Sequence, residues 1–329
     1  MTILVFLVAA SLAVAVIGFW ALRSRHEEDI WAIGIYGGTD PLRIAPLPAT
    51  NNLPVLTAQD VSDANAQFVA DPFLARHDGR WLLFFEVLNG DSGRGELAYA
   101  TSENGVHWQY RKVILKESFH LSYPQVFEFE GAWYMIPETG ESRSVRLYRA
   151  ARFPEGWTCV AELLQGNYLD PTLLRHEGRW WLFSLRDGKH LSLHFADRLE
   201  GPWTEHPSSP VSEDARLVRP GGRILVDGDR ILRFSQDGTA TYGHRAFVSV
   251  ITELTPSSYR EHLVTDNPLI CASGRGWNAD GMHHIDLQPA ADGSWLAAVD
   301  GKFIRRQFYW RKGVRAILDL LTGASRTPH

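Results

Sequence analysis

Residues 71–81 read DPFLARHDGRW, and this stretch decides the fold because close copies of it return along the chain. The copies read YPQVFEFEGAW at 123–133 and DPTLLRHEGRW at 170–180, with Gly seven residues after Pro and Trp two residues after Gly. Weaker copies begin at Arg219-Pro220 and His284. The intervals between successive marks are 52, 47, 51 and 64 residues, measured along Trp81, Trp133, Trp180, Ile231 and Trp295. Periods of this length, rich in aromatic residues and glycine turns, are typical of β-propeller blades.

Each repeat contains enough chain for a four-stranded blade. In the first, apolar runs predict strands at 72–77, 81–87 and 96–101 and a fourth ending near Val113, separated by turns at Asp78-Gly79 and Asn104-Gly105. The fourth repeat is less regular because Gly221-Gly222 lies in its first strand. We therefore predict an all-β, five-bladed propeller over residues 31–310.

The last repeat is too short to form a whole blade. After Trp295 the chain has room for one or two strands, such as 303–310. An early strand around Ile33 is expected to complete this blade and close the ring, which leaves only short, protected edges. Deletion of residues 31–36 should then cost much of the stability.

Composition limits the classes of partner. The chain has 329 residues and a net charge of −5, which argues against nucleic acid as a general partner. Cys159 and Cys271 lie far apart and have neither metal nor redox spacing. Neither a phosphate-binding glycine loop nor a metal cluster with convincing spacing stands out, so no cofactor and no metal are expected.

The N-terminal segment differs from the repeats. Residues 3–22 carry no charge and are long enough to cross a bilayer as a helix. A cleaved signal peptide is the alternative, but such a peptide normally has a positive charge before the apolar run. Here Arg23 and Arg25 follow it, which favours a single-pass anchor over residues 1–26 with the propeller on the cytoplasmic side.

The C-terminal region is basic. Positive charges cluster from Lys302 onward, and residues 311–329 are interpreted as a basic tail. A solvated chain end is one reading. Contact with anionic lipid or a lipid phosphate is the other, because each Lys or Arg near such a surface adds about 1 kcal/mol of binding free energy.

Propeller geometry predicts where functional side chains meet. The innermost strands begin around one mouth of the central channel, so the residues at their starts converge although they lie about fifty residues apart. These positions are Asp71, Tyr123, Asp170, Arg219 and, in the fifth repeat, His283 or His284.

The second strand of each hairpin returns to the same mouth. The residue fourteen positions after the Pro should therefore lie there too, and these residues are Glu86, Glu138, Leu185 and Phe234. Four carboxylates thus concentrate at one end of the ring. Paired carboxylates suit glycosidic chemistry, in which one activates water and the other protonates the leaving oxygen. Asp before Pro is also a common turn residue, so a purely structural role for these aspartates at the start of each blade remains an alternative.

Aromatic residues are mostly explained by packing. The repeated Trp residues match the blade period and are interpreted as core. Trp277 falls outside the repeated positions, and there it can stack on a sugar near the mouth.

The repeats resemble glycoside hydrolase families 43 and 32. Asp71-Pro72 resembles the first-blade Asp-Pro that carries the general base of family 43, Tyr123-Pro124 the second-blade Ala-Pro, and Asp170-Pro171 the motif of the orienting, pKa-modulating carboxylate. GMHHI at 281–285 resembles a fifth-blade segment whose His approaches a central ion or water. More closely, the stretches ADPFLARHDGRWLLFFEV, HLSYPQVFEFEGAWYMIPETG and GWNADGMHHID resemble the N-terminal propeller of plant glucosamine inositolphosphorylceramide transferases and its stand-alone bacterial relatives.

The fourth blade departs from this pattern. Family 43 carries its general acid there, whereas this chain has Arg219, which cannot deliver a proton at neutral pH. The resemblance then leaves Glu138 as the best replacement acid and Glu86 as the next. Arg219 suits a carboxylate or phosphate instead.

Three functional hypotheses follow. The first is a membrane-anchored, glycan-processing enzyme acting on an anionic or lipid-linked saccharide, with Asp71 as base, Asp170 orienting the sugar, Glu138 as acid and Arg219 holding the negative group. The second is a non-catalytic saccharide-binding propeller that positions a substrate or a partner glycosyltransferase. The third is transfer to a saccharide acceptor. In the plant proteins the transferase chemistry belongs to a separate domain, and fold alone does not fix function.

Overall fold

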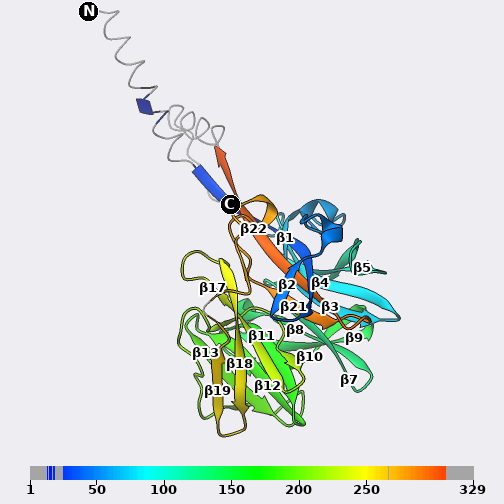
Figure 1. Cartoon of the computed structure of the whole chain (residues 1–329), viewed down its shortest axis with the longest axis vertical. Coiled ribbons are helices and arrows are strands. Elements are labelled where there is room, and N and C mark those ends of the chain that lie inside the picture. The colour runs from blue at the N-terminus through cyan, green and yellow to red at the C-terminus, as the bar shows by residue number, and fades with distance from the viewer. Residues whose placement is uncertain (1–12, 14, 17, 19–24, 266, 309–329) are drawn as a thin grey trace, which may run out of the picture. The chain divides into compact units, whose positions relative to one another are not determined.

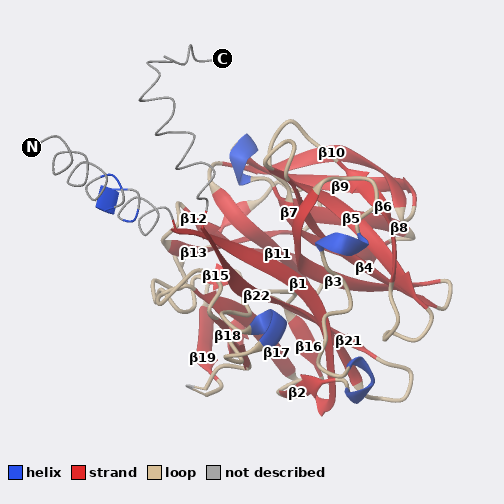
Figure 2. Cartoon of the chain, turned by 90° about the horizontal axis from the view of Figure 1, so that it is seen from above, coloured by secondary structure: helices blue, strands red, loops and turns tan. Residues whose placement is uncertain are grey.

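The computed structural model describes residues 13, 15, 16, 18, 25–265 and 267–308 (Figure 1). The chain divides into two compact units, one of residues 31–303 and the other of residues 1–30 together with 304–329. Residues 31–303 contain five antiparallel sheets, which are the blades of a five-bladed β-propeller. Strands make up most of this unit, and the helical pieces are short 3-10 turns (Figure 2). The predicted all-β propeller is confirmed.

Three blades follow the plan read from the sequence. Blade 1 consists of β3 (Ala66–His77), β4 (Arg80–Asn89), β5 (Arg94–Ser102) and β6 (Gln109–Leu115). Blade 2 consists of β7 (Ser122–Phe129), β8 (Ala132–Glu138), β9 (Ser144–Arg152) and β10 (Glu155–Gln165). Blade 3 consists of β11 (Tyr168–His176), β12 (Arg179–Arg186), β13 (His190–Ala196) and β14 (Thr204–Glu205).

The first hairpin of each of these blades turns at an acidic residue followed by Gly. Asp78 and Gly79 have φ of 50° and 78°, and the equivalent residues of blades 2 and 3 have similar values. Two successive positive φ values match the twist of the flanking strands, and Gly adopts such a value without strain. The tight turn places the Trp two residues after Gly on the return strand, where Trp81 and Trp180 are buried.

Blade 4 is irregular in the way that its glycines indicated. Its strands are β15 (Arg219–Pro220), β16 (Leu225–Asp227), β17 (Arg230–Asp237), β18 (Arg245–Leu254), β19 (Tyr259–Leu263) and β20 (Ile270–Cys271). Both β15 and β16 pair with β17, and the chain between them leaves the sheet at Gly221-Gly222. A Cβ on Gly222 would lie 1.8 Å from the carbonyl oxygen of Ile285, so only glycine fits this approach of blade 4 to blade 5.

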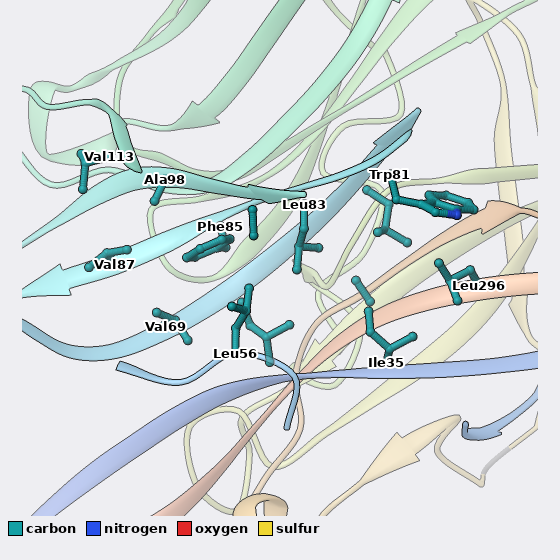
Figure 3. Close-up of a cluster of buried hydrophobic side chains, with 14 residues drawn as sticks. Ile35, Leu56, Val69, Trp81, Leu83, Phe85, Val87, Ala98, Val113 and Leu296 are labelled. Carbon is teal, nitrogen blue, oxygen red and sulfur yellow. The ribbon is translucent and has the colours of Figure 1, made fainter. Parts of the chain in front are cut away.

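Blade 5 joins both ends of the propeller sequence. Its strand order is β2 (Arg43–Pro46), β1 (Arg25–Asp40), β22 (Trp295–Phe308) and β21 (Ile285–Pro289), which confirms that the early strand completes the last blade. The prediction of a separate strand at 303–310 was wrong, because β22 runs without a break through Phe303. Ile33, Ile35 and Leu296 of blade 5 join Trp81 and Leu83 of blade 1 in one buried cluster (Figure 3).

Deletion of residues 31–36 should abolish cooperative unfolding. The deletion removes the buried side chains of Trp31, Ile33 and Ile35 and takes from β22 the neighbour that lies opposite β21. Burial of a large apolar side chain contributes about 1.5–3 kcal/mol, so the loss is roughly 5–9 kcal/mol, against a total stability of about 5–15 kcal/mol for ordinary proteins. Thermal unfolding followed by circular dichroism checks this, with a variant that starts at residue 25 as the control. A melting curve unchanged by the deletion would contradict the closure.

An ion pair between Arg223 and the fully buried Asp286 joins four blades. The Arg223 guanidinium binds Asp286 of blade 5, with Nε 2.8 Å from Oδ1, and also donates to the carbonyl oxygens of Val126 in blade 2 and Leu74 in blade 1. Asp286 Oδ2 in turn accepts a hydrogen bond from the backbone N–H of Leu74 at 2.6 Å. The innermost strands are thereby held together across the middle of the ring.

The predicted termini are only partly within the described residues. The proposed span at 3–22 and the tail at 311–329 lie largely or wholly outside them, and no helix among the described residues is long and apolar enough to cross a bilayer. In the smaller unit, Arg305 and Arg306 pair with Glu28 and Glu27. Lys302, assigned above to the basic region, is instead buried in β22 beside the rings of Trp31 and Tyr242, so it is not a lipid contact.

Candidate functional site

The inner strands of blades 1–3 begin with the same backbone distortion. Asp71, Tyr123 and Asp170 have φ of 52°, 50° and 49°, and each lies in a bulge where the pairing with the return strand shifts. Non-glycine residues rarely adopt positive φ, and bulges redirect side chains next to functional sites. Because Tyr123 has the same conformation, the distortion is a feature of the blade backbone and does not depend on an Asp side chain. The aspartates are thus not required as turn residues.

The return strands bring further acids to the same end, as predicted for two blades. Glu86 pairs with Ala70 and Glu138 with Ser122, each beside the bulged residue. In blade 4 the prediction of Phe234 was wrong: Gln236 pairs with Arg219, while Phe234 lies in the core. No bulge interrupts the β15–β17 register at Arg219-Pro220, so the return position moves by two residues.

Sequence reasoning missed one acid altogether. Asp300 of β22 is fully buried and accepts hydrogen bonds from the backbone N–H groups of Asp71, His283 and His284 at 3.0–3.2 Å. The sequence does contain a pattern that could have identified Asp300. In every blade, the residue on the second strand that returns to the mouth lies five positions after the repeated Trp, or after Ile231 in the fourth repeat. That count selects Glu86, Glu138, Leu185, Gln236 and Asp300.

Five carboxyl groups from four blades form what we call the acidic cluster. Its members are Asp71, Glu86, Glu138, Asp170 and Asp300, and all are buried. Each of the first three carries electrostatic contributions from other members, so they lie close enough to affect one another's ionisation. The predicted gathering of sequence-remote acids is therefore present in the structure.

Burial and neighbouring charges separate the ionisation of these acids. Burial raises the pKa of Asp71 to about 7, while His283 opposes the rise. Burial, together with the charge of Asp170, raises the pKa of Glu138 to about 8. Burial and the Asp71 carboxylate raise the pKa of Glu86 well above its usual range. Glu138 thus favours its protonated form at neutral pH, and Asp71 ionises more readily than Glu138.

Asp170 has two side-chain donors from blade 4. Arg219 Nε lies 2.5 Å from Asp170 Oδ2, and Gln236 Nε2 donates to the same oxygen at 3.0 Å. Arg219 was predicted to hold an external anion, and part of its charge is instead balanced by Asp170. Gln236 was not anticipated.

His283 is oriented by Asp300 and faces Asp71. Its Nδ1 lies 2.8 Å from Asp300 Oδ1, and its Nε2 lies 3.7 Å from Asp71 Oδ1 and 3.3 Å from the hydroxyl of Tyr242. Burial opposes its protonation, but Asp300 prevails and raises the pKa of His283. The ring also stacks on Trp31 at 4.2 Å. His283 therefore presents a fixed nitrogen to the base candidate.

A cation could bind beside His283. The resemblance implies an ion or water near the fifth-blade His, and ligand atoms of Asp71, His283 and Asp300 all lie within 4.8 Å of one another. Among the residues that the structure describes, neither ring nitrogen of buried His284 makes a hydrogen bond of normal geometry, and its Nδ1 lies 3.7 Å from Asp71 Oδ1. Burial lowers the pKa of His284 to about 3, so its ring is neutral and available as a ligand. The donor set fits a cation, and the absence of a metal stays a prediction.

Two other predicted residues have structural contacts. The buried hydroxyl of Tyr123 lies 2.8 Å from Thr172 Oγ1 and 2.8 Å from the backbone N of Gly222, so it joins blades 2, 3 and 4. The Trp277 indole donates to the carbonyl oxygen of Asn52 at 3.0 Å and its ring lies against Gly34. These contacts place Trp277 on blade 5, and its role in sugar stacking stays a prediction.

A cavity of about 550 Å³ adjoins the acidic cluster between blades 3 and 4. Arg219 and Gln236, which hold Asp170, both line it. Its other lining residues include Leu185, Lys189, Val218 and Tyr242.

Comparisons with known proteins agree on one family and one fold. Residues 24–302 match the family model described as glucosamine inositolphosphorylceramide transferase 1, N-terminal. The chain is 32% identical to a protein of that name from Oryza sativa subsp. indica, over 96% of this chain and 49% of the rice protein. It is 31% identical to the Arabidopsis thaliana protein, over 84% of this chain and 39% of the relative. The chain thus spans at most about half the length of these relatives.

Among solved structures, the catalytic domain of a Coprinopsis cinerea GH62 α-L-arabinofuranosidase superposes with a TM-score of 0.53. The match covers 72% of this chain and 91% of that domain at 16% identity. An exo-β-1,3-galactanase from Clostridium thermocellum superposes with a TM-score of 0.54 at 16% identity, over 63% of this chain and 51% of the other. At such identities these matches establish only that the folds are alike.

Proposed function

The chain belongs to the family of the N-terminal region of glucosamine inositolphosphorylceramide transferase 1, and from this membership and the acidic cluster we propose that it processes a saccharide. Its propeller is of a glycosyltransferase-associated kind with a glycoside hydrolase-like fold. The substrate class that we propose is an anionic or lipid-linked saccharide, and the reaction is cleavage of a glycosidic bond. We further propose that residues 3–22 anchor the chain in a membrane, with the propeller on the cytoplasmic side.

The observation that carries the proposal is the pair formed by Asp71 and Glu138. They lie on neighbouring blades, at the bulge and the return position, and their pKa values differ in the order that acid–base catalysis needs. In the proposed step, Asp71 removes a proton from water as the water oxygen attacks the anomeric carbon. Glu138 gives its proton to the departing oxygen as the glycosidic bond breaks.

Asp170 and Arg219 have supporting roles in this proposal. Asp170, fixed by Arg219 and Gln236, orients the sugar and contributes negative charge that keeps Glu138 protonated. Arg219 donates to Asp170 through its Nε. The terminal guanidinium nitrogens can then bind a carboxylate or phosphate of the ligand in the cavity that Arg219 lines. Glu86 remains the reserve candidate for the acid.

A non-catalytic saccharide-binding propeller is the second candidate. The observation that favours it is that Asp170 is almost fully buried and ion-paired, as a structural residue would be. In that case the cluster accepts hydrogen bonds from sugar hydroxyls and delivers the glycan to a partner glycosyltransferase.

The experiment is a glycan screen with a pH profile. The full-length chain in detergent is offered neutral, uronate-containing and phosphorylated oligosaccharides and glycolipids, and both binding and cleavage are recorded. For a cleaved substrate, kcat/KM should rise as Asp71 ionises through pH about 7 and fall as Glu138 loses its proton through pH about 8. The control is Glu138→Gln, which should lose the upper limb. Binding without cleavage anywhere in the panel would favour the second candidate, and a profile lying wholly below pH 6 would refute these assignments.

A further inference from the structure

One blade breaks the polar pattern of the return positions. Blades 1, 2, 4 and 5 have Glu, Glu, Gln and Asp five residues after the repeat mark, whereas blade 3 has Leu185. Leu185 is buried against the blade 3 core and lines the cavity. Leu185 and Val218 form an apolar wall of the cavity. The positions equivalent to Leu185 in the other blades carry hydrogen-bonding side chains. Such a wall suits the C–H face of a sugar ring better than its hydroxyls.

An exposed aromatic ring lies between the cavity and the acidic cluster. Tyr242 lines the cavity with 47% of its surface exposed, although it is anchored on several sides. Its hydroxyl lies 3.3 Å from His283 Nε2, Trp31 packs edge-on against it at 6.1 Å, and the Arg219 guanidinium lies 5.1 Å from the ring centre. The ring is therefore held in place while much of its surface faces solvent. Amphipathic aromatic rings of this kind supply contact area at low entropic cost.

Two positively charged side chains, Lys189 and Arg219, line the cavity. Lys189 follows the tight turn of the β12–β13 hairpin at Asp187-Gly188, lines the cavity and has no ion pair among the described residues. The cavity carboxylate Glu213 lies 3.3 Å from His190 Nδ1, which also lines the cavity. Arg219, which is paired with Asp170, adds donors from the neighbouring blade 4. Two cations that converge on one cavity from neighbouring blades fit a carboxylate or a phosphate ester.

We propose that this cavity is a second saccharide subsite, which binds a sugar residue that carries a negative charge next to the residue held at the acidic cluster. The sugar ring packs on Tyr242 and Leu185, and its anionic substituent lies between Lys189 and Arg219. This assignment rests on the proposed function, since it supplies the anionic part of the same substrate. It predicts that selectivity for charge resides in Lys189 and that affinity for the ring resides in Tyr242.

Binding to the full-length chain tests the assignment with probes of matched shape. The probes are glucuronate and galacturonate, glucose and galactose, and the corresponding hexose 6-phosphates, each titrated by ligand-observed NMR. Uronates or hexose phosphates should bind more tightly than the neutral hexoses, and which of the two binds identifies the anion. Lys189→Met should weaken the anionic probe about five- to tenfold and leave the neutral hexoses unchanged. Tyr242→Ala should weaken charged and neutral probes alike by about tenfold or more.

Matched variants separate the possible failures. Arg198→Gln removes the same charge from an exposed position of blade 3 and should change no affinity. Asp71→Asn should remove turnover but keep binding of the anionic probe. If Lys189→Met and Arg198→Gln behave alike while Asp71→Asn still removes turnover, the subsite is wrong and the proposed function stands. If no probe binds and no glycan of the screen is cleaved, both are overturned.

Discussion

Replacement of Asp71 by Asn should lower kcat on any cleaved glycan by about a thousandfold, because general base catalysis typically contributes 10²–10⁴ in rate. The change keeps the size of the side chain and an oxygen that can accept the hydrogen bond of the Tyr123 N–H. It also removes a charge from a cluster in which burial already disfavours ionisation, so the folded state should not lose stability. The measurement is the initial rate for wild type and variant, with thermal unfolding curves for both.

Glu138→Gln gives the complementary result. Loss of the acid should cost as much on natural linkages, but the defect should shrink on a 4-nitrophenyl glycoside, whose leaving group needs no proton. Asp71→Asn should show no such recovery. The control is Asp197→Asn, an exposed carboxylate of blade 3, which should keep the full rate. Full activity in either cluster variant would remove that residue from its proposed role.

Replacement of Asp286 by Ala should destabilise the propeller by about 3–5 kcal/mol, the usual cost of removing one partner of a buried ion pair. The variant leaves the partly buried Arg223 guanidinium without its counter-charge and the N–H of Leu74 without its acceptor. Because Arg223 also holds the carbonyl oxygens of Val126 and Leu74, the inner strands of several blades should loosen together. The free energy of unfolding in urea measures the effect.

A surface pair provides the comparison. Asp227→Ala breaks the contact of Asp227 with Arg230 at the β16–β17 turn and should cost no more than about 1 kcal/mol. The double variant Arg223→Met with Asp286→Leu should recover much of the loss, since apolar pairs often replace buried ion pairs without penalty. A change below about 1 kcal/mol for Asp286→Ala would contradict the role of this pair.

The ring could be predicted from the sequence because one hairpin is repeated with little variation. The Pro, the glycine turn and the Trp fix the register of β3 with β4, so a simple count placed Glu86 and Glu138 beside the bulges. The same count failed at Phe234, because it assumed a bulge that blade 4 lacks. A count of five residues forward from the repeated Trp, or from Ile231 in blade 4, avoids this error, because these residues lie on the second strand, after the bulge of the first strand. The same count from Trp295 identifies Asp300.

Other residues of the site lie outside the repeated motif, so the repeat could not predict their positions. Tyr242 lies in the loop between β17 and β18, and Trp31 lies in the strand that closes the ring, so no spacing could place them against His283. Lys302 was grouped with the basic tail by its sequence neighbours. Its burial depends on the length of β22, which apolar pattern alone did not indicate.

The closure of blade 5 has a consequence for biosynthesis. During synthesis β1 emerges from the ribosome early, whereas its partner β22 emerges more than 250 residues later. At 5–20 residues per second this interval lasts roughly 13–50 s. During that interval the edge of β1 that pairs with β22 has no partner strand, and an unpaired edge can pair with other chains. Cells that make this protein should therefore benefit from a chaperone that shields the nascent N-terminal strand.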